Sequence, residues 1–143
     1  MTVREWKYED ILAVTNLEKQ CFPDALTYKA YADSFLAGHF HGVLAEEDGK
    51  LVGYGFITCV FEVADLDRIA VAPDSRGKGV GKEVLNALFD TAKSLGAERM
   101  MLEVRESNAP AIALYEKSGF TRISKREKYY GDGETALVYE KYL

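Results

Sequence analysis

The feature that most restricts the fold of this chain is a glycine-rich turn inside residues 69–82, Ile-Ala-Val-Ala-Pro-Asp-Ser-Arg-Gly-Lys-Gly-Val-Gly-Lys. A short apolar run leads into the turn, and from Val80 onward apolar residues recur at helical spacing until Gly96. Glycines at a helix start let the backbone approach an anion, and free N–H groups and the helix dipole attract phosphate. The segment therefore predicts a phosphate-binding strand–turn–helix unit, although an ordinary loop before a core helix has a similar composition. The predicted apolar stripe is Val84, Leu85, Leu88, Phe89, Ala92 and Leu95.

The spacing of the turn excludes two common phosphate motifs. A Walker A loop needs Gly-x-x-x-x-Gly-Lys followed by Ser or Thr, but Arg76 stands at the first glycine position and Glu83 follows Lys82. A dinucleotide-binding fingerprint needs its third glycine three positions after the second, whereas the glycines here are spaced by two. The sequence therefore predicts neither a P-loop triphosphatase nor a Rossmann dehydrogenase.

The rest of the chain predicts the element order β-α-α-β-β-β-α-β-α-β-β. Asp48-Gly49 between apolar segments is a strong hairpin signal, because such turns need positive φ angles. A hairpin combined with β-α-β crossovers predicts an α/β fold with a mixed sheet and helices on both faces. The predicted elements are a strand starting at Val3, helices at 11–21 and 28–37, strands at 41–45, 51–61 and 63–71, the helix from Val80, a strand at 100–104, a helix at 111–117 and two terminal strands around the turn 131–133.

Composition limits the class of protein. A chain of 143 residues with 48% hydrophobic residues is expected to form a single domain over residues 1–143. A net charge of −5 argues against nucleic acid as a direct partner, because binding its backbone needs a basic surface. No apolar run reaches the roughly 20 residues of a membrane span, and no signal-peptide pattern is present, so we expect a cytoplasmic protein without a membrane partner.

The cysteines and histidines do not predict a metal site. Cys21 and Cys59 are far apart and belong to no Cys-x-x-Cys pair, so we expect buried or unreactive thiols. His39 and His41 have no cysteine or carboxylate companion at a ligand spacing. No bound metal is therefore expected.

The glycine-rich segment resembles the acetyl-CoA loop of the GNAT superfamily of N-acetyltransferases. Arg76, Gly79 and Gly81 match the family pattern Arg/Gln-x-x-Gly-x-Gly/Ala, and the preceding Ile-Ala-Val-x-Pro also matches. The resemblance implies the GNAT fold, with a mixed, mostly antiparallel central sheet, and acetyl-CoA as co-substrate. It also implies that the turn binds the pyrophosphate and that the end of the strand binds the pantetheine arm. The implied cofactor residues are Ile69, Ala70, Val71, Arg76, Gly77, Lys78, Gly79, Val80, Gly81 and Lys82.

Acetyl transfer to an amine needs a free lone pair on the amine and a proton for the departing thiolate. Glu103 is a candidate base, because strand alternation places it opposite the apolar Leu102 and Val104. A strand-end glutamate paired with Arg105, or with another basic residue, gives the same pattern. Tyr115 is a candidate acid because a phenol can donate its proton, but aromatic residues at helical spacing are also typical of a core.

A second motif, at residues 102–120, reads Leu-Glu-Val-Arg-x-x-Asn-x-x-Ala-Ile-x-Leu-Tyr-Glu-x-x-Gly-Phe. It is similar to the signature of RimI-type N-terminal acetyltransferases, which modify the N-terminal alanine of a small-subunit ribosomal protein. The resemblance implies that Glu103 is the general base, Tyr115 the general acid and Asn108 a CoA contact. Asn108 can equally cap the helix that begins beside Pro110, and the two roles are compatible.

Two further segments are similar to substrate-binding parts of this family. Cys21-Phe22-Pro23 matches the first substrate loop, and Tyr129-Tyr130 resembles the paired tyrosines that wall the peptide entrance. The implied substrate residues are thus Phe22, Tyr129 and Tyr130, with cross-strand packing as the alternative for the tyrosines. The chain departs from the family at Ala25-Leu26, where Pro-Trp is frequent, and this departure bears on the substrate more than on the cofactor.

Three functions are compatible with these motifs. The first is acetyl-CoA-dependent acetylation of the N-terminal α-amine, an alanine, of a protein by direct attack in a ternary complex, with a ribosomal protein as the implied partner. The second is acetylation of a small amine, which the unusual segment Asp24-Ala25-Leu26 motivates. The third is a non-catalytic acetyl-CoA sensor, against which Glu103, Asn108 and Tyr115 argue. The oligomeric state is left open by the sequence.

Overall fold

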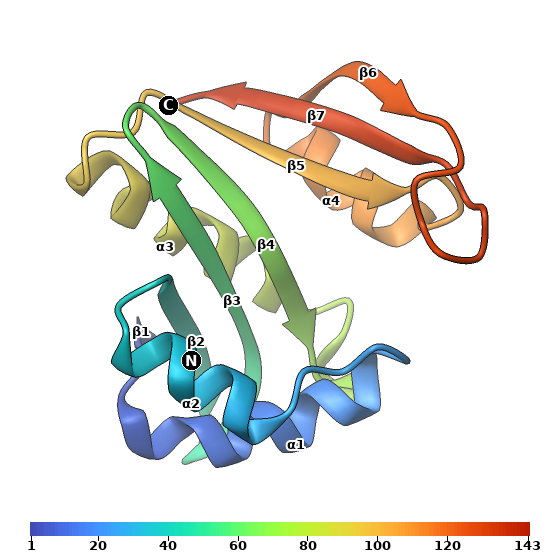
Figure 1. The fold of residues 1–143 in the computed structure, drawn as a ribbon. Helices are drawn as coiled ribbons and strands as arrows, with labels where there is room; N and C mark the ends of the chain where they lie inside the picture. Colours follow the sequence, from blue (N-terminus) through green and yellow to red (C-terminus); the bar gives the residue numbers. More distant parts are fainter.

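The computed structural model describes residues 1–143 and contains one seven-stranded sheet with helices on both faces (Figure 1). The predicted element order and the α/β class are confirmed, and two short 3-10 helices are additional. The elements are β1 (Thr2–Glu5), η1 (Tyr8–Asp10), α1 (Ile11–Cys21), α2 (Tyr28–Leu36), β2 (His41–Glu47), β3 (Lys50–Val60), β4 (Val63–Val71), η2 (Pro73–Ser75), α3 (Val80–Ser94), β5 (Arg99–Arg105), α4 (Ala109–Lys117), β6 (Thr121–Arg126) and β7 (Ala136–Tyr142).

The strands are arranged in the order β1-β2-β3-β4-β5-β7-β6, and only β4 and β5 pair in parallel. Helix α3 connects these two strands, as a parallel pair requires. The connection β5-α4-β6 does not create a second parallel pair, because β7 lies between β5 and β6. The sheet is therefore mixed and mostly antiparallel, as the resemblance implied.

The two halves of the sheet are joined over a short stretch. β4 pairs with β5 only from Val63–Arg99 to Asp65–Met101, and Figure 1 shows the two strands diverging beyond this joint. A bulge in β4 lies at the point of divergence. Neighbouring residues of β3 pair with Leu66 and Arg68, so Asp67 between them has no partner residue on β3. Because a bulge bends its strand, it contributes to the separation. The carboxyl-terminal ends of β4 and β5 are thus free to border a ligand site.

The β2–β3 hairpin confirms the predicted turn. The φ angles are 54° at Asp48 and 75° at Gly49, which is the left-handed pair that a type I′ turn requires. The paired strands extend to the turn itself, since Glu47 pairs with Lys50. Strand β2 is therefore two residues longer than the predicted 41–45.

Each face of the sheet has its own core. Helices α3 and α4 cover one face, and α1 and α2 cover the other together with Trp6. The predicted apolar stripe of α3 is buried from Val84 to Ala92. The prediction was wrong for Leu95, which is 42% exposed, because α3 ends at Ser94 and Leu95 caps it outside the packed face.

A buried ionic network joins α1, α2 and the sheet. Glu18 is fully buried and accepts hydrogen bonds from the hydroxyls of Tyr31 and Tyr54. The same carboxylate accepts the Leu26 N–H at 2.7 Å and pairs with Arg68 of β4 at 2.8 Å. Burial and the hydrogen bond to Glu18 raise the pKa of both phenols, so they remain protonated donors at neutral pH. The network anchors the connection between α1 and α2 to the sheet.

We expect Arg68→Met to destabilise the fold by about 3 kcal/mol, because removing one partner of a buried pair leaves the other charge uncompensated. The free energy of urea-induced unfolding measures the effect. Lys29→Met is the control, since it removes an exposed pair with Asp33 and should cost less than about 0.5 kcal/mol. Equal effects of the two substitutions would contradict this account of Glu18.

Candidate active site

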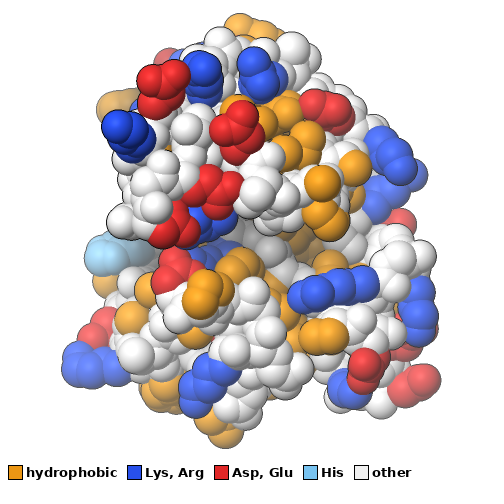
Figure 2. All heavy atoms as spheres, turned by 90° about the vertical axis from the view of Figure 1, so that its right-hand side faces the viewer, with side chains coloured by type: hydrophobic (Ala, Val, Ile, Leu, Met, Phe, Trp, Pro, Cys, Tyr) orange, Lys and Arg blue, Asp and Glu red, His pale blue; other side chains and the backbone are white.

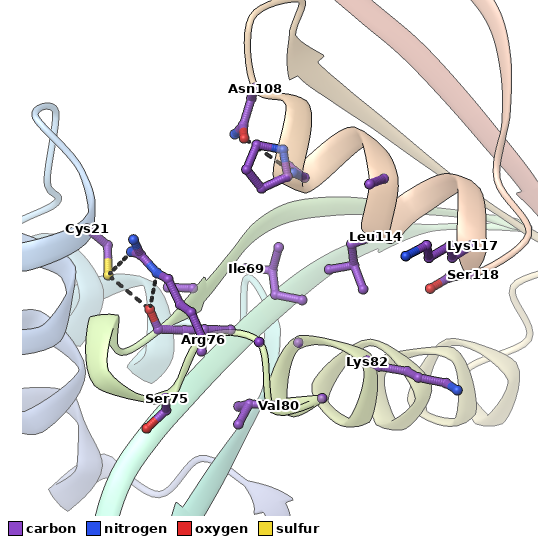
Figure 3. A pocket seen from close by; sticks show the side chains of 18 of the residues that line it. Cys21, Ile69, Ser75, Arg76, Val80, Lys82, Asn108, Leu114, Lys117 and Ser118 are labelled. Atoms are coloured by element: carbon purple, nitrogen blue, oxygen red, sulfur yellow. Dashed lines mark hydrogen bonds between the residues drawn. The ribbon is translucent and has the colours of Figure 1, made fainter.

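A cavity of about 760 Å³ lies between α3 and α4, next to the free end of β4 (Figure 3). The glycine-rich turn and the start of α3 form one side, and α4 forms the other. In Figure 3, Ile69 and Leu114 face each other across this space. The lining residues are Cys21, Phe22, Ile69, Ala70, Val71, Ser75, Arg76, Gly77, Gly79, Val80, Gly81, Lys82, Asn108, Pro110, Ala111, Ala113, Leu114, Lys117 and Ser118.

The cavity brings together the residues that the sequence assigned to the cofactor, with one exception. Lys78 is exposed and does not line it. Asn108 lines it and also accepts the Ala111 N–H at 3.3 Å as the cap of α4, so both of its predicted positions are compatible. Phe22, predicted to contact the substrate, lies in this cavity as well, and the Arg68 guanidinium stacks 4.2 Å from its ring centroid.

The turn presents backbone groups to the cavity. Gly77 and Gly79 have φ angles of 76° and 84°, and a β-carbon on either would meet no atom within 4 Å. Glycine is therefore required at these two positions by the left-handed backbone, and not because a side chain would clash with a neighbouring atom. Gly79 caps α3, whose first N–H groups have no partner inside the helix and carry its partial positive charge. Together with the nearby cations Arg76 and Lys82, these groups suit the diphosphate of a coenzyme A thioester.

Arg76 joins the turn to the end of α1. Its Nε donates to the Val71 carbonyl at 3.2 Å, and its Nη2 lies 3.8 Å from the Cys21 Sγ (Figure 3). The Cys21 thiol also reaches the Val71 carbonyl at 3.7 Å. Cys21 is a free, half-buried thiol at the cavity wall, a position that the sequence did not predict.

The sequence also missed one whole wall of the cavity. The α4 residues that line it recur every three or four positions, and this spacing places them on one helix face. The pattern was present in the sequence, but only Asn108, at the start of this helix, was predicted to contact the cofactor. These residues are Pro110, Ala111, Ala113, Leu114, Lys117 and Ser118.

A second cavity, of about 500 Å³, is bordered by β4, β5 and the β6–β7 connection. Figure 2 shows the molecule hollowed between its two halves, with acidic side chains gathered along one rim of the hollow. This cavity contains three predicted residues, Glu103, Tyr129 and Tyr130, which come from separate parts of the chain. The other lining residues, not predicted, are Asp65, Leu66, Asp67, Met101, Leu102, Arg126 and Val138.

Glu103 lies at the rim of the second cavity with 31% of its side chain exposed. Its nearest cation is Arg126, with 3.8 Å between Oε1 and Nη1. The alternative of a paired glutamate is correct for another basic residue, Arg126, and wrong for Arg105, because the Arg105 guanidinium binds Asp132 at 2.8 Å and Glu134 at 3.0 Å. The Glu103 carboxylate thus has one long, partly exposed ion pair and is accessible to a ligand in the cavity.

Two aspartates of β4 face the same space. Burial and the charge of Glu103 raise the pKa of Asp65. Burial likewise raises the pKa of Asp67, against the effect of the hydrogen bond that it accepts from Thr58. A cation in the cavity would relieve the repulsion among the carboxylates of Asp65, Asp67 and Glu103, so the site favours a positively charged ligand.

Tyr115 belongs to the core between α4 and the sheet. It is 7% exposed, and its ring meets Phe120 edge to face with centroids 5.7 Å apart. Burial, with a smaller contribution from Tyr130, raises the pKa of the phenol, so Tyr115 keeps its proton at neutral pH. Its side chain lines neither cavity, and the core-packing alternative is correct for the ring.

Tyr129 and Tyr130 form an edge-to-face pair with centroids 5.1 Å apart. Both follow the end of β6 at Arg126, so neither belongs to a paired strand and the cross-strand alternative is wrong. They form the part of the wall of the second cavity that the β6–β7 connection contributes.

No set of three or more His, Cys, Asp or Glu side chains is arranged to hold a metal ion. None of the helices has both the length and the apolar character needed to cross a membrane.

Comparison with known proteins relates this geometry to one family. Residues 11–120 match the sequence profile of the acetyltransferase (GNAT) family. A Bacillus subtilis protein with a provisional assignment as a ribosomal protein bS18-alanine N-acetyltransferase is 36% identical, over 95% of this chain and 91% of the relative. The ribosomal protein bS18-alanine N-acetyltransferase of Escherichia coli K12 is 32% identical, over 90% of this chain and 86% of the relative.

A solved structure is similar over the whole fold. The crystal structure of the ribosomal-protein-S18-alanine N-acetyltransferase from Escherichia coli matches with a TM-score of 0.88 at 30% identity, covering 99% of this chain and 92% of that one. Its likeness includes the arrangement of strands and helices that borders both cavities.

We expect Gly79→Ala to weaken the binding of acetyl-CoA about tenfold. Placing a residue other than glycine in the left-handed region costs roughly 1–2 kcal/mol, so the turn of the variant adopts another conformation. Binding acetyl-CoA must then restore the original turn at this cost. Calorimetry measures the dissociation constant. Gly38→Ala is the matched control, because Gly38 has a φ of 71° and open space around it but does not line the cavity. An equal loss in both variants would argue against the turn as the binding site.

Proposed function

This chain belongs to the GNAT acetyltransferase family and is an acetyl-CoA-dependent N-acetyltransferase, and we propose that its acceptor is the N-terminal alanine of a protein. The observation that carries the proposal is the second cavity, which holds Glu103 and the two tyrosines across the sheet opening from the cofactor cavity. The names of the relatives support a ribosomal protein as the partner. In this proposal residues 1–143 act as one acetyltransferase domain.

The proposed cofactor site is the first cavity. The turn residues from Arg76 to Lys82 would hold the diphosphate, the end of β4 would pair with the pantetheine arm, and Asn108 would contact CoA. Lys78 does not line this cavity and would contribute only by joining Gly77 to Gly79 in the turn. Bound there, acetyl-CoA supplies an acetyl group activated as a thioester.

The chain's own residues would move the protons. Glu103 accepts the proton of the amine, either directly or through a water molecule. An α-amine is suited to a single carboxylate, because its reference pKa near 8 leaves roughly 10% as free base at pH 7, against about 0.04% for lysine. Tyr115, whose ring belongs to the core and lines neither cavity, would donate the proton of its hydroxyl to the departing sulfur, since a phenol with an ordinary pKa of about 10 already holds its proton at neutral pH.

The acidic lining supports the choice of an amine acceptor. Asp65, Asp67 and Glu103 border the cavity, and Arg126 is the cation among its lining residues. A protonated amine is attracted to such a site before it loses its proton. Phe22, Tyr129 and Tyr130 would contact the acceptor, with Phe22 approaching from the cofactor side.

We expect Glu103→Gln and Tyr115→Phe each to lower kcat about 100-fold or more while acetyl-CoA affinity changes little, because each removes a proton-transfer group and keeps its shape. Steady-state kinetics and calorimetry separate the two effects. Glu106→Gln and Tyr142→Phe make the same chemical changes at exposed positions outside both cavities and should retain wild-type kcat. Wild-type turnover in the Glu103 and Tyr115 variants would exclude their proposed roles.

We expect a hexapeptide with an N-terminal alanine to be acetylated with a higher kcat/KM than free amines such as polyamines and amino acids. The same peptide with a blocked N-terminus and an internal lysine is the control, and mass spectrometry locates the acetylated nitrogen. The second candidate, a small-molecule acetyltransferase, is favoured by the departure at Asp24–Leu26 and would be indicated by a preference for free amines.

A further inference from the structure

The turn between β6 and β7 is folded around the guanidinium of Arg105. One nitrogen, Nη1, donates to Asp132 at 2.8 Å and to Glu134 at 3.0 Å. The guanidinium also lies over the Tyr130 ring, 4.0 Å from its centroid. A single side chain of β5 therefore contacts the beginning, the middle and the end of this turn.

The other contacts of the turn fix its internal shape. The Tyr130 N–H donates to the Glu134 carbonyl at 3.1 Å, and the Gly133 N–H donates to the Tyr130 carbonyl at 2.8 Å. The Glu134 carboxylate also accepts the Ser107 N–H at 2.9 Å, which attaches it to the segment after β5. The turn is thus preformed, and its two carboxylates are the groups by which β5 holds it.

We propose that Arg105 is a positioning residue, which clamps the β6–β7 turn to β5 and so holds Tyr130 in the wall of the acceptor cavity. This inference rests on the proposed function, because it takes the second cavity as the acceptor site. A stacked arginine keeps the ring in one orientation, and Nη1 of Arg105 binds two carboxylates at the same time.

The clamp also separates two neighbouring functional groups. Arg105 and Glu103 are two residues apart on β5, so their side chains share one face of the sheet. With Asp132 and Glu134 as its partners, Arg105 does not pair with Glu103. The carboxylate proposed as the base thus stays open to the acceptor.

The test uses Arg105→Met, which keeps an unbranched apolar side chain and removes both ion pairs and the stacking. We expect the KM for the acceptor to rise about tenfold, with kcat and the KM for acetyl-CoA within about twofold of wild type. The reason is that Arg105 acts only on the wall of the acceptor cavity that Tyr130 forms. Trypsin should cleave faster after Lys128, which lies in the released connection. Arg105→Lys should recover part of the acceptor KM, because it keeps an ion pair but not the planar stack.

A double-mutant cycle distinguishes positioning from general stability. If Arg105 acts through Tyr130, Arg105→Met should add little to the acceptor KM of Tyr130→Ala. The pair Asp132→Asn and Glu134→Gln removes the clamp from the turn and should raise the acceptor KM as Arg105→Met does, so it carries the test if the Arg105 variant does not fold. It should also lower kcat, because the freed Arg105 can then pair with Glu103. Glu127→Gln is the control, because it removes the neighbouring exposed pair with Lys125 and leaves the clamp intact.

All variants are measured with the best acceptor of the wild-type enzyme, whether a peptide or a free amine. An unchanged acceptor KM, additive effects in the cycle, or an equal rise in the KM for acetyl-CoA would overturn the inference. A wild-type preference for free amines would instead overturn the proposed peptide acceptor, and the effect of Arg105 on the KM of that amine would still decide the inference.

Discussion

The short parallel pairing of β4 with β5 is the constraint on which the rest of the structure depends. The strands are held together from Val63 to Asp65 and then diverge, with a bulge at Asp67 where they part. Backbone groups at the free strand ends are not committed to the sheet, and the space between the two halves becomes the ligand site. Both cavities border this opening, one toward α3 and α4 and the other toward the β6–β7 turn.

The segments that border this opening must not collapse into it, and ion pairs hold them in place. On one side the buried Glu18 and Arg68 attach the α1–α2 connection to β4. On the other side Arg105 attaches the β6–β7 turn to β5. These anchors are charged and directional, so they hold a loop in one position where apolar packing would allow several. The departure from the family at Ala25-Leu26 falls on the first of them, since the Leu26 N–H donates to Glu18 at 2.7 Å.

In the proposed function, the division into two cavities separates the cofactor from the acceptor. The proposed cofactor side offers backbone amides at a helix start and a few cations, which suit a charged and constant ligand. The proposed acceptor side offers carboxylates and aromatic rings, which suit a cationic group with an apolar neighbour. Family membership explains why the first side agrees so closely with a known pattern, while Asp65, Asp67 and Arg126 on the second side belong to no motif recognised in the sequence.

The sequence by itself determined the element order, the hairpin at Asp48-Gly49 and the glycine-rich turn before α3, because periodicity and positive φ angles are local properties. It also indicated Glu103 and Tyr115 as candidate catalytic residues, because the spacing of the motif at residues 102–120 can be recognised without knowing the fold. Only the tertiary structure decided that β7 separates β6 from β5, that Glu103 does not pair with Arg105, and that Glu18 receives four donors. These facts depend on which distant segments become neighbours, and a residue pattern along the chain carries no information on partners that the sheet order alone brings together.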